Sequence, residues 1–307
     1  MAPGDGIHTI IYIRMKMNWR MHTRGAAIAV GAALALCCGD ALAVDPGNVR
    51  WHNESADTTR ITDILIAHAV RPLPAAGEIL AGVAAEFTGT PYGAGTLDIA
   101  PEAVTVNLDS TDCMAFVENA AALTMTLLER RGSWIDFVYN LERLRYRNGT
   151  AGDYASRLHY FSDWVVDNSH KGIVTEVTDR VGNASSAVKT LDYMTRNRSL
   201  YPALADSAAF ARMTNAQMGY RNHKFSYLKP AAAARAAIRT GDILAFTTKT
   251  PGLDVSHVGI AVVRDGKVYL LHASSKAGKV VLSDVPLEAY LKRNHGISGV
   301  RVVRMKD

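Results

Sequence analysis

Cysteine is scarce in this chain. It has three cysteines in 307 residues, and two of them, Cys37 and Cys38, are adjacent. Both lie in a segment that is typical of a cleavable export signal. Once that segment is removed, Cys113 is the only thiol, so the exported form has no second cysteine for an internal disulfide. Cys113 is therefore either a small buried hydrophobic residue or a reactive group.

Long apolar runs are also lacking. The first 43 residues have the three parts of a secretory signal: four basic residues, an apolar stretch at 25–36, and small residues at Ala41 and Ala43. An apolar stretch of this length is too short to cross a bilayer, which needs about 20 residues. We expect cleavage after Ala43, no membrane span afterwards, and a location in the periplasm or outside the cell. A lipoprotein anchored through Cys37 is the less favoured alternative, because Leu36 is not the small residue that lipid attachment usually requires.

Strong charge of either sign is absent as well. The chain has 34 Lys and Arg against 29 Asp and Glu, a net charge of +5. No cluster of basic residues with interleaved aromatics is present, so we expect no nucleic-acid partner. The sequence has no internal repeat and no long linker rich in Gly, Ser or Pro. Residues 44–307 are therefore predicted to form a single domain, and we expect a monomer.

The apolar pattern divides this domain into a helical part, 59–220, and a sheet part, 240–305. Apolar residues recur at helical spacing at 61–70 and 75–87, and again from Cys113 until Gly132 ends the run. Weaker helix patterns cover 133–145, 154–166, 187–196 and 203–218. Short β-branched segments bounded by turn residues follow at 241–247, 255–264, 267–273, 279–283 and 299–304. Helices followed by an antiparallel meander indicate an α+β fold.

Cys113 follows Asp109, Ser110, Thr111 and Asp112, a cluster of residue types that cap helices. We therefore expect Cys113 in the first turn of a helix. Free backbone N–H groups at that end favour a thiolate and would lower the cysteine pKa. The Asp112 carboxylate opposes this unless it caps the backbone. The same N–H groups could hold the oxyanion formed when a carbonyl group is attacked.

Two histidines are placed by the segment from Arg264 to Lys267, which reads as a hairpin with Asp265 and Gly266 at its tip. In that register Val263 faces Val268, Ala261 faces Leu270, and Gly259 faces His272. His257 then lies on the same face as His272, as a diagonal neighbour. A hydrogen bond between the two rings is feasible.

Gly259 and Ala261 share this face, and their small side chains are expected to let the helix that begins at Cys113 approach it. The arrangement would align Cys113 as nucleophile, His257 as base and His272 as the group that orients the base. Zinc is the competing interpretation, because cysteine and histidine are good ligands. The sequence has no closely spaced ligand pair and no evident fourth ligand, so we expect neither a metal nor another cofactor.

These segments resemble the NlpC-type papain-like cell-wall hydrolases. The resemblance lies in Cys113, then the segment from Ser256 to Ala261, then the segment from Leu271 to Ala273. It is closer still to the branch described as N-acetylmuramoyl-L-alanine amidase-like, formerly a domain of unknown function, at 108–119, 156–161 and 252–260. The likeness extends from about residue 60 to about residue 305.

The resemblance implies a papain-like fold and cysteine-dependent hydrolysis of the amide between N-acetylmuramic acid and L-alanine, in peptidoglycan or muropeptides. It assigns Cys113, His257 and His272 the roles of nucleophile, base and orienting group, and it places Tyr92 near the oxyanion. Other candidates for the substrate site are Ser110, Asp112, Arg157, His159 and Ser256. The alternatives are a γ-D-glutamyl-diaminopimelate endopeptidase of the same superfamily and a catalytically silent wall-binding module. The segment that contains Arg157 and His159 could equally be an ordinary amphipathic helix.

Overall fold

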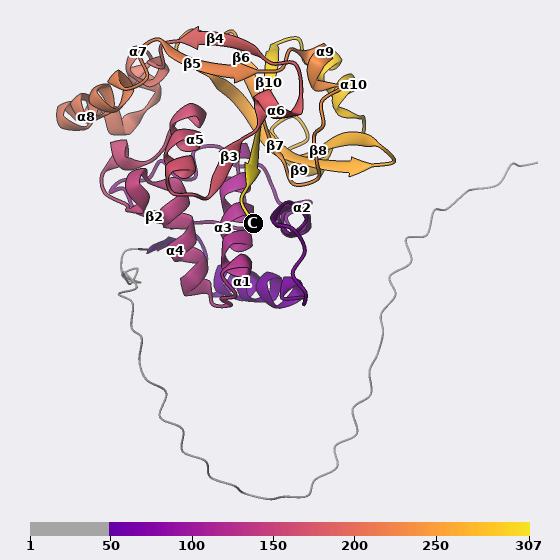
Figure 1. Ribbon diagram of the computed structural model, residues 1–307. Coiled ribbons are helices and arrows are strands. Elements are labelled where there is room, and N and C mark those ends of the chain that lie inside the picture. Colours follow the sequence, from indigo (N-terminus) through magenta and orange to yellow (C-terminus); the bar gives the residue numbers. More distant parts are fainter. Residues whose placement is uncertain (1–48) are drawn as a thin grey trace, which may run out of the picture. The chain divides into compact units, whose positions relative to one another are not determined.

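A computed structural model describes residues 49–307, in which the helices of the first half of this range gather on one side of a β-sheet (Figure 1). The predicted export signal at 1–43 lies outside the described residues, together with Cys37 and Cys38. No helix within the described range is both long and apolar enough to cross a bilayer. The mixed α and β content and the antiparallel sheet near the C-terminus confirm the α+β prediction at that level.

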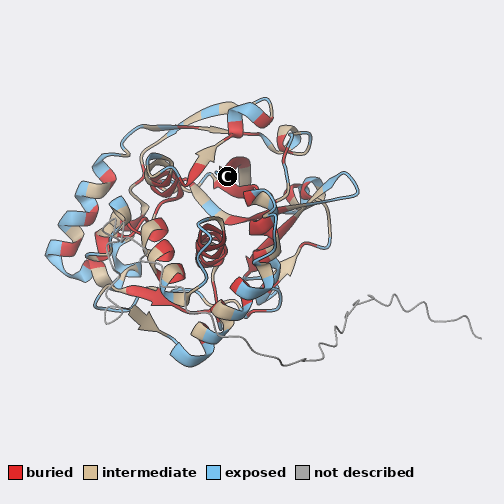
Figure 2. Cartoon of the chain, turned by 60° about the horizontal axis from the view of Figure 1, so that its bottom comes forward, coloured by how far each residue is buried: buried red, intermediate tan, exposed pale blue. Residues whose placement is uncertain are grey.

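The helical side is built around α3, Cys113–Leu128, most of whose residues are buried. It packs against α1, Glu54–His68, α2, Ala76–Ala85, and α4, Trp134–Arg145. Ser133 begins α4 with a reciprocal capping box to Asp136, which explains the sharp start of this helix. Two short strands, β1 (Val49–Trp51) and β2 (Val104–Val106), pair in parallel, and β2 contacts α4. Figure 2 shows buried residues in the middle of the molecule and exposed residues on the outer helix faces.

The sheet has the strand order β3-β10-β6-β7-β8-β9, and every neighbouring pair is antiparallel. The expected meander is present from β6 to β9. The last strand does not continue it, because the chain passes through α10, Leu287–Arg293, and returns to pair with β6. The strands are β3 Val174–Glu176, β6 Ile243–Thr248, β7 Val255–Arg264, β8 Lys267–Ser274, β9 Lys279–Leu282 and β10 Ile297–Met305.

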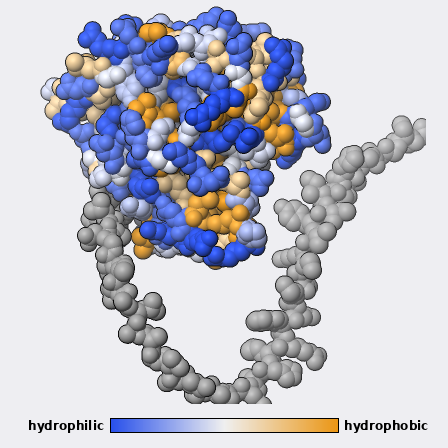
Figure 3. All heavy atoms as spheres, viewed as in Figure 1, coloured by the Kyte–Doolittle hydropathy of each residue, from blue (hydrophilic) through white to orange (hydrophobic). Residues whose placement is uncertain are grey.

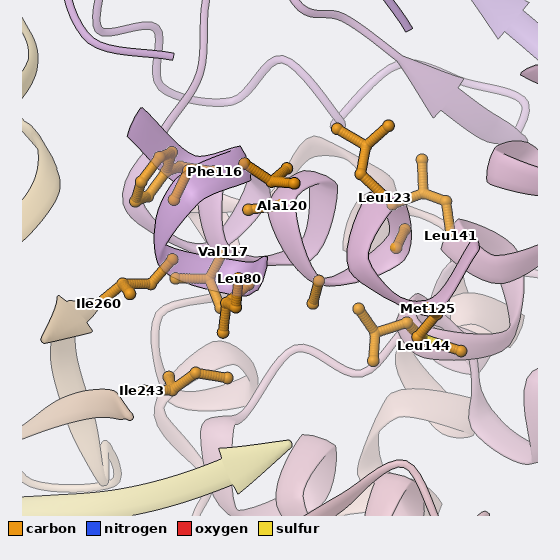
Figure 4. Close-up of a cluster of buried hydrophobic side chains, with 14 of the residues drawn as sticks. Leu80, Phe116, Val117, Ala120, Leu123, Met125, Leu141, Leu144, Ile243 and Ile260 are labelled. Atoms are coloured by element: carbon orange, nitrogen blue, oxygen red, sulfur yellow. The ribbon is translucent and has the colours of Figure 1, made fainter. Parts of the chain in front are cut away.

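The two faces of this sheet bury different cores. On one face, Val258 and Ile260 of β7 pack with Phe116 and Val117 of α3. Figure 4 shows Ile243 and Ile260 beside Val117 and Leu80, with Leu123 farther along α3 next to Leu141 and Leu144 of α4. On the opposite face, alternate residues of the strands pack against the buried leucines of α10. These are Leu244, Phe246, Ala261 and Leu270, covered by Leu287 and Leu291.

Between the helical core and the sheet, residues 154–233 differ most from the sequence prediction. The helix expected at 154–166 is a short 3-10 turn, Tyr154–Ser156, followed by α5 at Phe161–His170. The helix expected at 187–196 is wrong in its first half, which forms a strand because Ser185–Lys189 alternates and pairs with β5. The elements here are α6 Thr178–Val181, β4 Ser185–Lys189, α7 Tyr193–Arg196, α8 Ser207–Met218, β5 His223–Tyr227 and α9 Pro230–Ala233.

Lys189, at the end of β4, connects this segment to the sheet. Its ammonium group donates hydrogen bonds to the carbonyl oxygens of Thr248 at 2.7 Å, Thr250 at 3.1 Å and Leu253 at 2.8 Å. Those carbonyls belong to the last residue of β6 and to the loop that leads from it to β7. The three donors of an ammonium are thereby all used on one loop, which fixes the chain just before β7.

The surface is mostly hydrophilic in the view of Figure 3, with an apolar patch near its lower edge, where Figure 1 places α1. Ile66 on α1 and Val70 just after it are among the exposed large apolar side chains. Single exposed apolar residues are common on protein surfaces.

Candidate active site

Cys113 is the first residue of α3, in the first turn as the sequence predicts. Asp112 is the N-cap, and its Oδ1 accepts hydrogen bonds from the N–H of Met114 at 2.9 Å and of Ala115 at 2.8 Å. The carboxylate is thus turned onto the backbone. Two of the free N–H groups of the helix end are consumed by this cap, which leaves the N–H of Cys113 itself.

The chain before Cys113 is shaped by Asn107, whose Oδ1 accepts the N–H of Asp109 and of Ser110, both at 3.0 Å. Its Nδ2 donates to the Ser110 hydroxyl at 3.2 Å. Ser110, a candidate for substrate contact, therefore has a structural partner inside its own loop. A side chain at Gly93 would meet the Ser110 hydroxyl at 2.9 Å, so glycine permits the close approach of the two segments.

Tyr92 lies beside this loop through a β-bridge to Thr111. The pKa of its hydroxyl is raised, first by burial and then by the nearby Cys113 and Asp112. The segment predicted to lie near the nucleophile is therefore brought to it.

The two histidines meet as the hairpin register predicts. Val263 pairs with Val268 and Ala261 with Leu270, and the left-handed backbone of Asp265 and Gly266 forms the turn between the strands. His257 Nε2 and His272 Nδ1 are 2.7 Å apart, and the rings are nearly perpendicular, at 81°. Because Nε2 of His257 is engaged by His272, Nδ1 is the ring nitrogen left for other chemistry.

The expected docking of α3 on the Gly259 face is wrong. The helix packs on the opposite face, against Val258 and Ile260. A side chain at Gly259 would instead meet Leu270 at 2.7 Å and His272 at 2.9 Å. The glycine therefore makes room for its strand neighbours, and α10 covers that face. The physical reason is the strand alternation, which sends the large apolar residues of β7 to α3 and the small ones away from it.

Cys113 nonetheless reaches β7 at its edge. The backbone N–H of Val258, the residue after His257, lies close enough to the sulfur to lower the thiol pKa, as do the N–H groups of Cys113 and Met114. The residue as a whole is partly exposed, while the sulfur is closely surrounded by protein atoms. The thiol therefore sits against the backbone that carries the His257 ring.

The electrostatics of the site differ from the sequence expectation. Burial, and then the Asp112 charge, raise the pKa of the Cys113 thiol to about 12, although the backbone N–H groups act in the opposite direction. The expected lowering of this pKa is therefore wrong. Burial also lowers the pKa of His257 to about 3, with a further contribution from His272. Burial lowers the pKa of His272 to about 4. The resting site holds a neutral thiol and two neutral imidazoles.

An open groove of about 1010 Å³ begins at the histidines. The candidates Ser256, His257 and His272 line it. The rest of the lining combines hydroxyl-bearing and basic side chains with apolar ones. The polar group includes Ser274, Ser275, Ser283, Lys276, Arg293 and His295, and the apolar group includes Val281, Leu282, Val285 and Ile297. Asp284 is the one carboxylate among the described lining residues, and it pairs with Arg293 at 3.4 Å on the exposed rim.

Tyr290 of α10 also lines this groove, and it is not among the residues expected from the sequence. Its ring lies 5.6 Å from that of His272. The signal available in the sequence is the spacing of Leu287, Tyr290 and Leu291, which fits one face of a short helix.

Arg157 and His159 have partners inside the protein. Arg157 is buried and bonds Asp98 at 2.6 Å, with Glu102 at 3.1 Å. Burial raises the pKa of Asp112, and the Arg157 charge opposes that rise, which places Arg157 within electrostatic reach of the helix start. The Nε2 of His159 lies 2.7 Å from the carbonyl oxygen of Tyr154, and burial lowers its pKa well below the usual value. The structure connects His159 to this turn and not to the thiol.

Within residues 49–307, no group of three or more His, Cys, Asp or Glu side chains is arranged to hold a metal ion.

Comparisons with known proteins identify relatives. A family model described as N-acetylmuramoyl-L-alanine amidase-like matches residues 82–297. The crystal structure of an N-acetylmuramoyl-L-alanine amidase from Bacteroides uniformis is 37% identical, with a TM-score of 0.72, over 76% of this chain and 99% of that chain. A protein from Bacteroides fragilis described as a putative xylanase is 39% identical, with a TM-score of 0.68, over 73% of this chain and 100% of that one.

A protein from Legionella pneumophila, 19% identical, shares the fold, with a TM-score of 0.63 over 83% of this chain and 95% of that chain. The search among curated proteins gave no significant match.

Proposed function

Because the chain belongs to the N-acetylmuramoyl-L-alanine amidase-like family, we propose that it hydrolyses the amide between N-acetylmuramic acid and L-alanine, with Cys113 as nucleophile. The substrate is peptidoglycan or its soluble muropeptides. We further propose that the fold is a member of the NlpC-type papain-like superfamily, and that the protein is exported to the periplasm or the cell exterior as a monomer. The amidase name of the Bacteroides uniformis relative supports the substrate class.

The observation that carries the proposal is a thiol at a helix start, close to the backbone of Val258, together with a hydrogen-bonded pair of imidazoles that includes the preceding residue, His257. His257 Nε2 donates to His272 Nδ1 in the tautomer that the reaction requires, so His257 Nδ1 has a free lone pair. This nitrogen takes the thiol proton as the sulfur attacks the amide carbon, and a tetrahedral oxyanion forms. His272 then stabilises the imidazolium of His257 by accepting its Nε2–H.

Collapse of the tetrahedral intermediate breaks the C–N bond, and His257 gives its proton to the leaving amine of L-alanine. The lactyl group of muramic acid remains on Cys113 as a thioester. Water then attacks this thioester while His257 takes one of its protons. The C–S bond breaks, the acid is released, and His257 returns the proton to the sulfur.

The oxyanion has a limited set of donors at this site. Asp112 occupies the N–H groups of Met114 and Ala115. The N–H of Cys113 and the hydroxyl of Tyr92 are therefore the donors we assign to the oxyanion. Asp112 acts by fixing the helix end, Ser256 contacts substrate in the groove, and Arg157 stabilises the Asp112 carboxylate.

The proton must move together with the attack. Burial raises the pKa of the thiol to about 12 and lowers the pKa of His257 to about 3. Both changes disfavour a separated thiolate and imidazolium relative to the neutral pair. Proton transfer concerted with C–S bond formation avoids that state.

Mass spectrometry of muropeptide digests tests the proposal, because the product masses identify the bond. Amidase activity releases a stem peptide that begins with L-alanine, whereas the endopeptidase alternative releases products cut after D-glutamate. A glycosidase would cut the sugar chain, a reaction that usually employs two carboxylates. Cys113→Ala should abolish turnover with the fold preserved by circular dichroism, and His272→Ala should cost less activity than His257→Ala. Turnover by Cys113→Ala would refute the mechanism, and a wall-binding module would give no products at all.

A further inference from the structure

Tyr290 has a defined position although it belongs to a short helix. Leu287 and Leu291, on the same side of α10, are buried in the second core. The N–H of Tyr290 bonds the carbonyl oxygen of Pro286 at 3.0 Å. These contacts hold the helix against β8 and direct the Tyr290 ring toward the imidazoles, at the wall of the groove.

Four rings form a closed set around the hydrogen bond between the histidines. The Tyr290 ring is 5.6 Å from that of His272 and nearly perpendicular to it, at 84°. It is also 5.6 Å from the ring of Phe246. Phe246 in turn lies 5.9 Å from His257, nearly parallel at 21°. The two imidazoles, 4.9 Å apart, complete the set. Each ring of this aromatic quartet contacts two others, at separations typical of aromatic pairs.

The quartet explains how the imidazole orientations are fixed. A single hydrogen bond joins the rings of His257 and His272, and one bond leaves each ring free to rotate about it. Phe246 blocks rotation of His257 by lying flat against it, and Tyr290 blocks His272 by its perpendicular contact. Phe246 is fully buried, whereas Tyr290 is half-buried and lines the groove.

We propose that Tyr290 is a positioning residue whose ring closes the aromatic quartet and holds His272, and through it His257, in the orientation for proton exchange with Cys113. This inference rests on the proposed cysteine hydrolysis where it predicts a change in kcat. Its prediction for the His272 ring does not depend on that function. The Tyr290 hydroxyl lies close enough to Cys113 for the thiol to raise the tyrosine pKa, after burial. The ring, and not this hydroxyl, is assigned the positioning role.

Tyr290 should also set the acidity of His272, because its ring packs against that imidazole at the wall of the groove. The titratable groups in contact with His272 are His257 from β7 and Tyr290 from α10, both neutral at rest. The charged groups of the groove lie on its exposed rim, and they are Lys276, Asp284 and Arg293. Burial alone accounts for the low pKa of His272. Water admitted by loss of the ring would therefore raise this pKa toward its ordinary value.

The test compares Tyr290→Phe, which keeps the ring, with Tyr290→Leu, which removes it. Tyr139→Leu is the matched control, because that ring lies on α4 between Arg131 and Arg143. Nitrogen NMR of the imidazoles, recorded in full-length protein over pH, gives the tautomer and pKa of each histidine without any activity. Steady-state kinetics on muropeptides gives kcat and KM separately, and circular dichroism checks the fold.

Tyr290→Leu should raise the His272 pKa by about one unit or more and lower kcat on the order of tenfold with little change in KM. Tyr290→Phe and the control should keep the wild-type values. Wild-type histidine spectra in a folded Tyr290→Leu variant would overturn the proposal, as would Tyr290→Phe losing as much kcat as Tyr290→Leu. If Tyr290→Leu does not fold, Tyr290→Met takes its place with the same expected shifts. The NMR result stands even if no muropeptide is cleaved, so failure of the proposed function and failure of this inference are distinguishable.

Discussion

Alkylation of Cys113 by iodoacetamide measures how strongly its surroundings disfavour the thiolate. An ordinary cysteine has a pKa of 9.0, and here burial and Asp112 raise the value to about 12. At pH 8 this change reduces the thiolate fraction by about 1000-fold. A more basic thiolate is also a better nucleophile, which over three pKa units restores about 20-fold. We therefore expect folded Cys113 to react about 50-fold more slowly than an exposed cysteine.

The assay is a time course at several pH values, quantified on the peptide that contains Cys113 so that Cys37 and Cys38 do not interfere. The same chain unfolded in urea supplies the reference rate. The folded rate should still be rising with pH at pH 10. Asp112→Asn should accelerate labelling, because it removes the second largest cause of the raised pKa. His257→Ala should change it little, since that ring is neutral.

A labelling rate that is fast at pH 6 and constant to pH 9 would refute this reasoning. It would mean that the resting enzyme holds a thiolate and an imidazolium. A neutral pair instead gives slow alkylation together with ordinary turnover at pH 7, because substrate attack and proton transfer occur in one step.

Three further predictions concern stability, each measured by urea unfolding. His272 has a pKa of about 4 in the folded protein against 6.5 when unfolded, so the unfolded chain binds the proton first as the pH falls. Relative to His272→Gln, the free energy of unfolding of the wild type should therefore fall by about 3 kcal/mol between pH 6.5 and pH 4. A difference between the two proteins that does not change with pH would contradict the burial of His272. Glu118→Gln removes the negative charge that lies 2.7 Å from the buried guanidinium of Arg145. It should lower the free energy of unfolding by about 3–5 kcal/mol. A loss below ~1 kcal/mol would show that water reaches the pair. Gly241→Ala places a methyl group 1.9 Å from the carbonyl oxygen of Gly77 in α2 and should prevent normal folding. Gly266→Ala, also at positive φ but in open space, should cost only about 1–2 kcal/mol. Equal effects of the two substitutions would contradict the close approach of Gly241 to α2.

Local patterns predicted the parts of the site that local chemistry determines. The capping residues before Cys113 placed it in the first turn of α3. The Asp265-Gly266 turn fixed the register of β7 and β8, and hence the meeting of His257 with His272. Both results follow from interactions within about fifteen residues, which a sequence displays directly.

The packing between distant segments was less accessible. Which face of β7 receives α3 depends on where Val258 and Ile260 find partners, and those partners lie more than 100 residues away. The thiol pKa depends on the density of atoms around the sulfur, which no local pattern contains. Tyr290 was missed for the same reason, because its importance arises only when α10 folds back over the two histidines.

The three hydrogen bonds from Lys189 have a consequence for attempts to reduce this protein to a smaller one. A version with residues 178–227 deleted would retain the cysteine and both imidazoles in its sequence. It would also remove the cation that gathers the carbonyl oxygens of Thr248, Thr250 and Leu253. Those oxygens lie just before β7, the strand that bears His257. The hairpin of β4 and β5 therefore helps to hold this strand in place through Lys189. A truncated protein would have to supply another hydrogen-bond donor at that position.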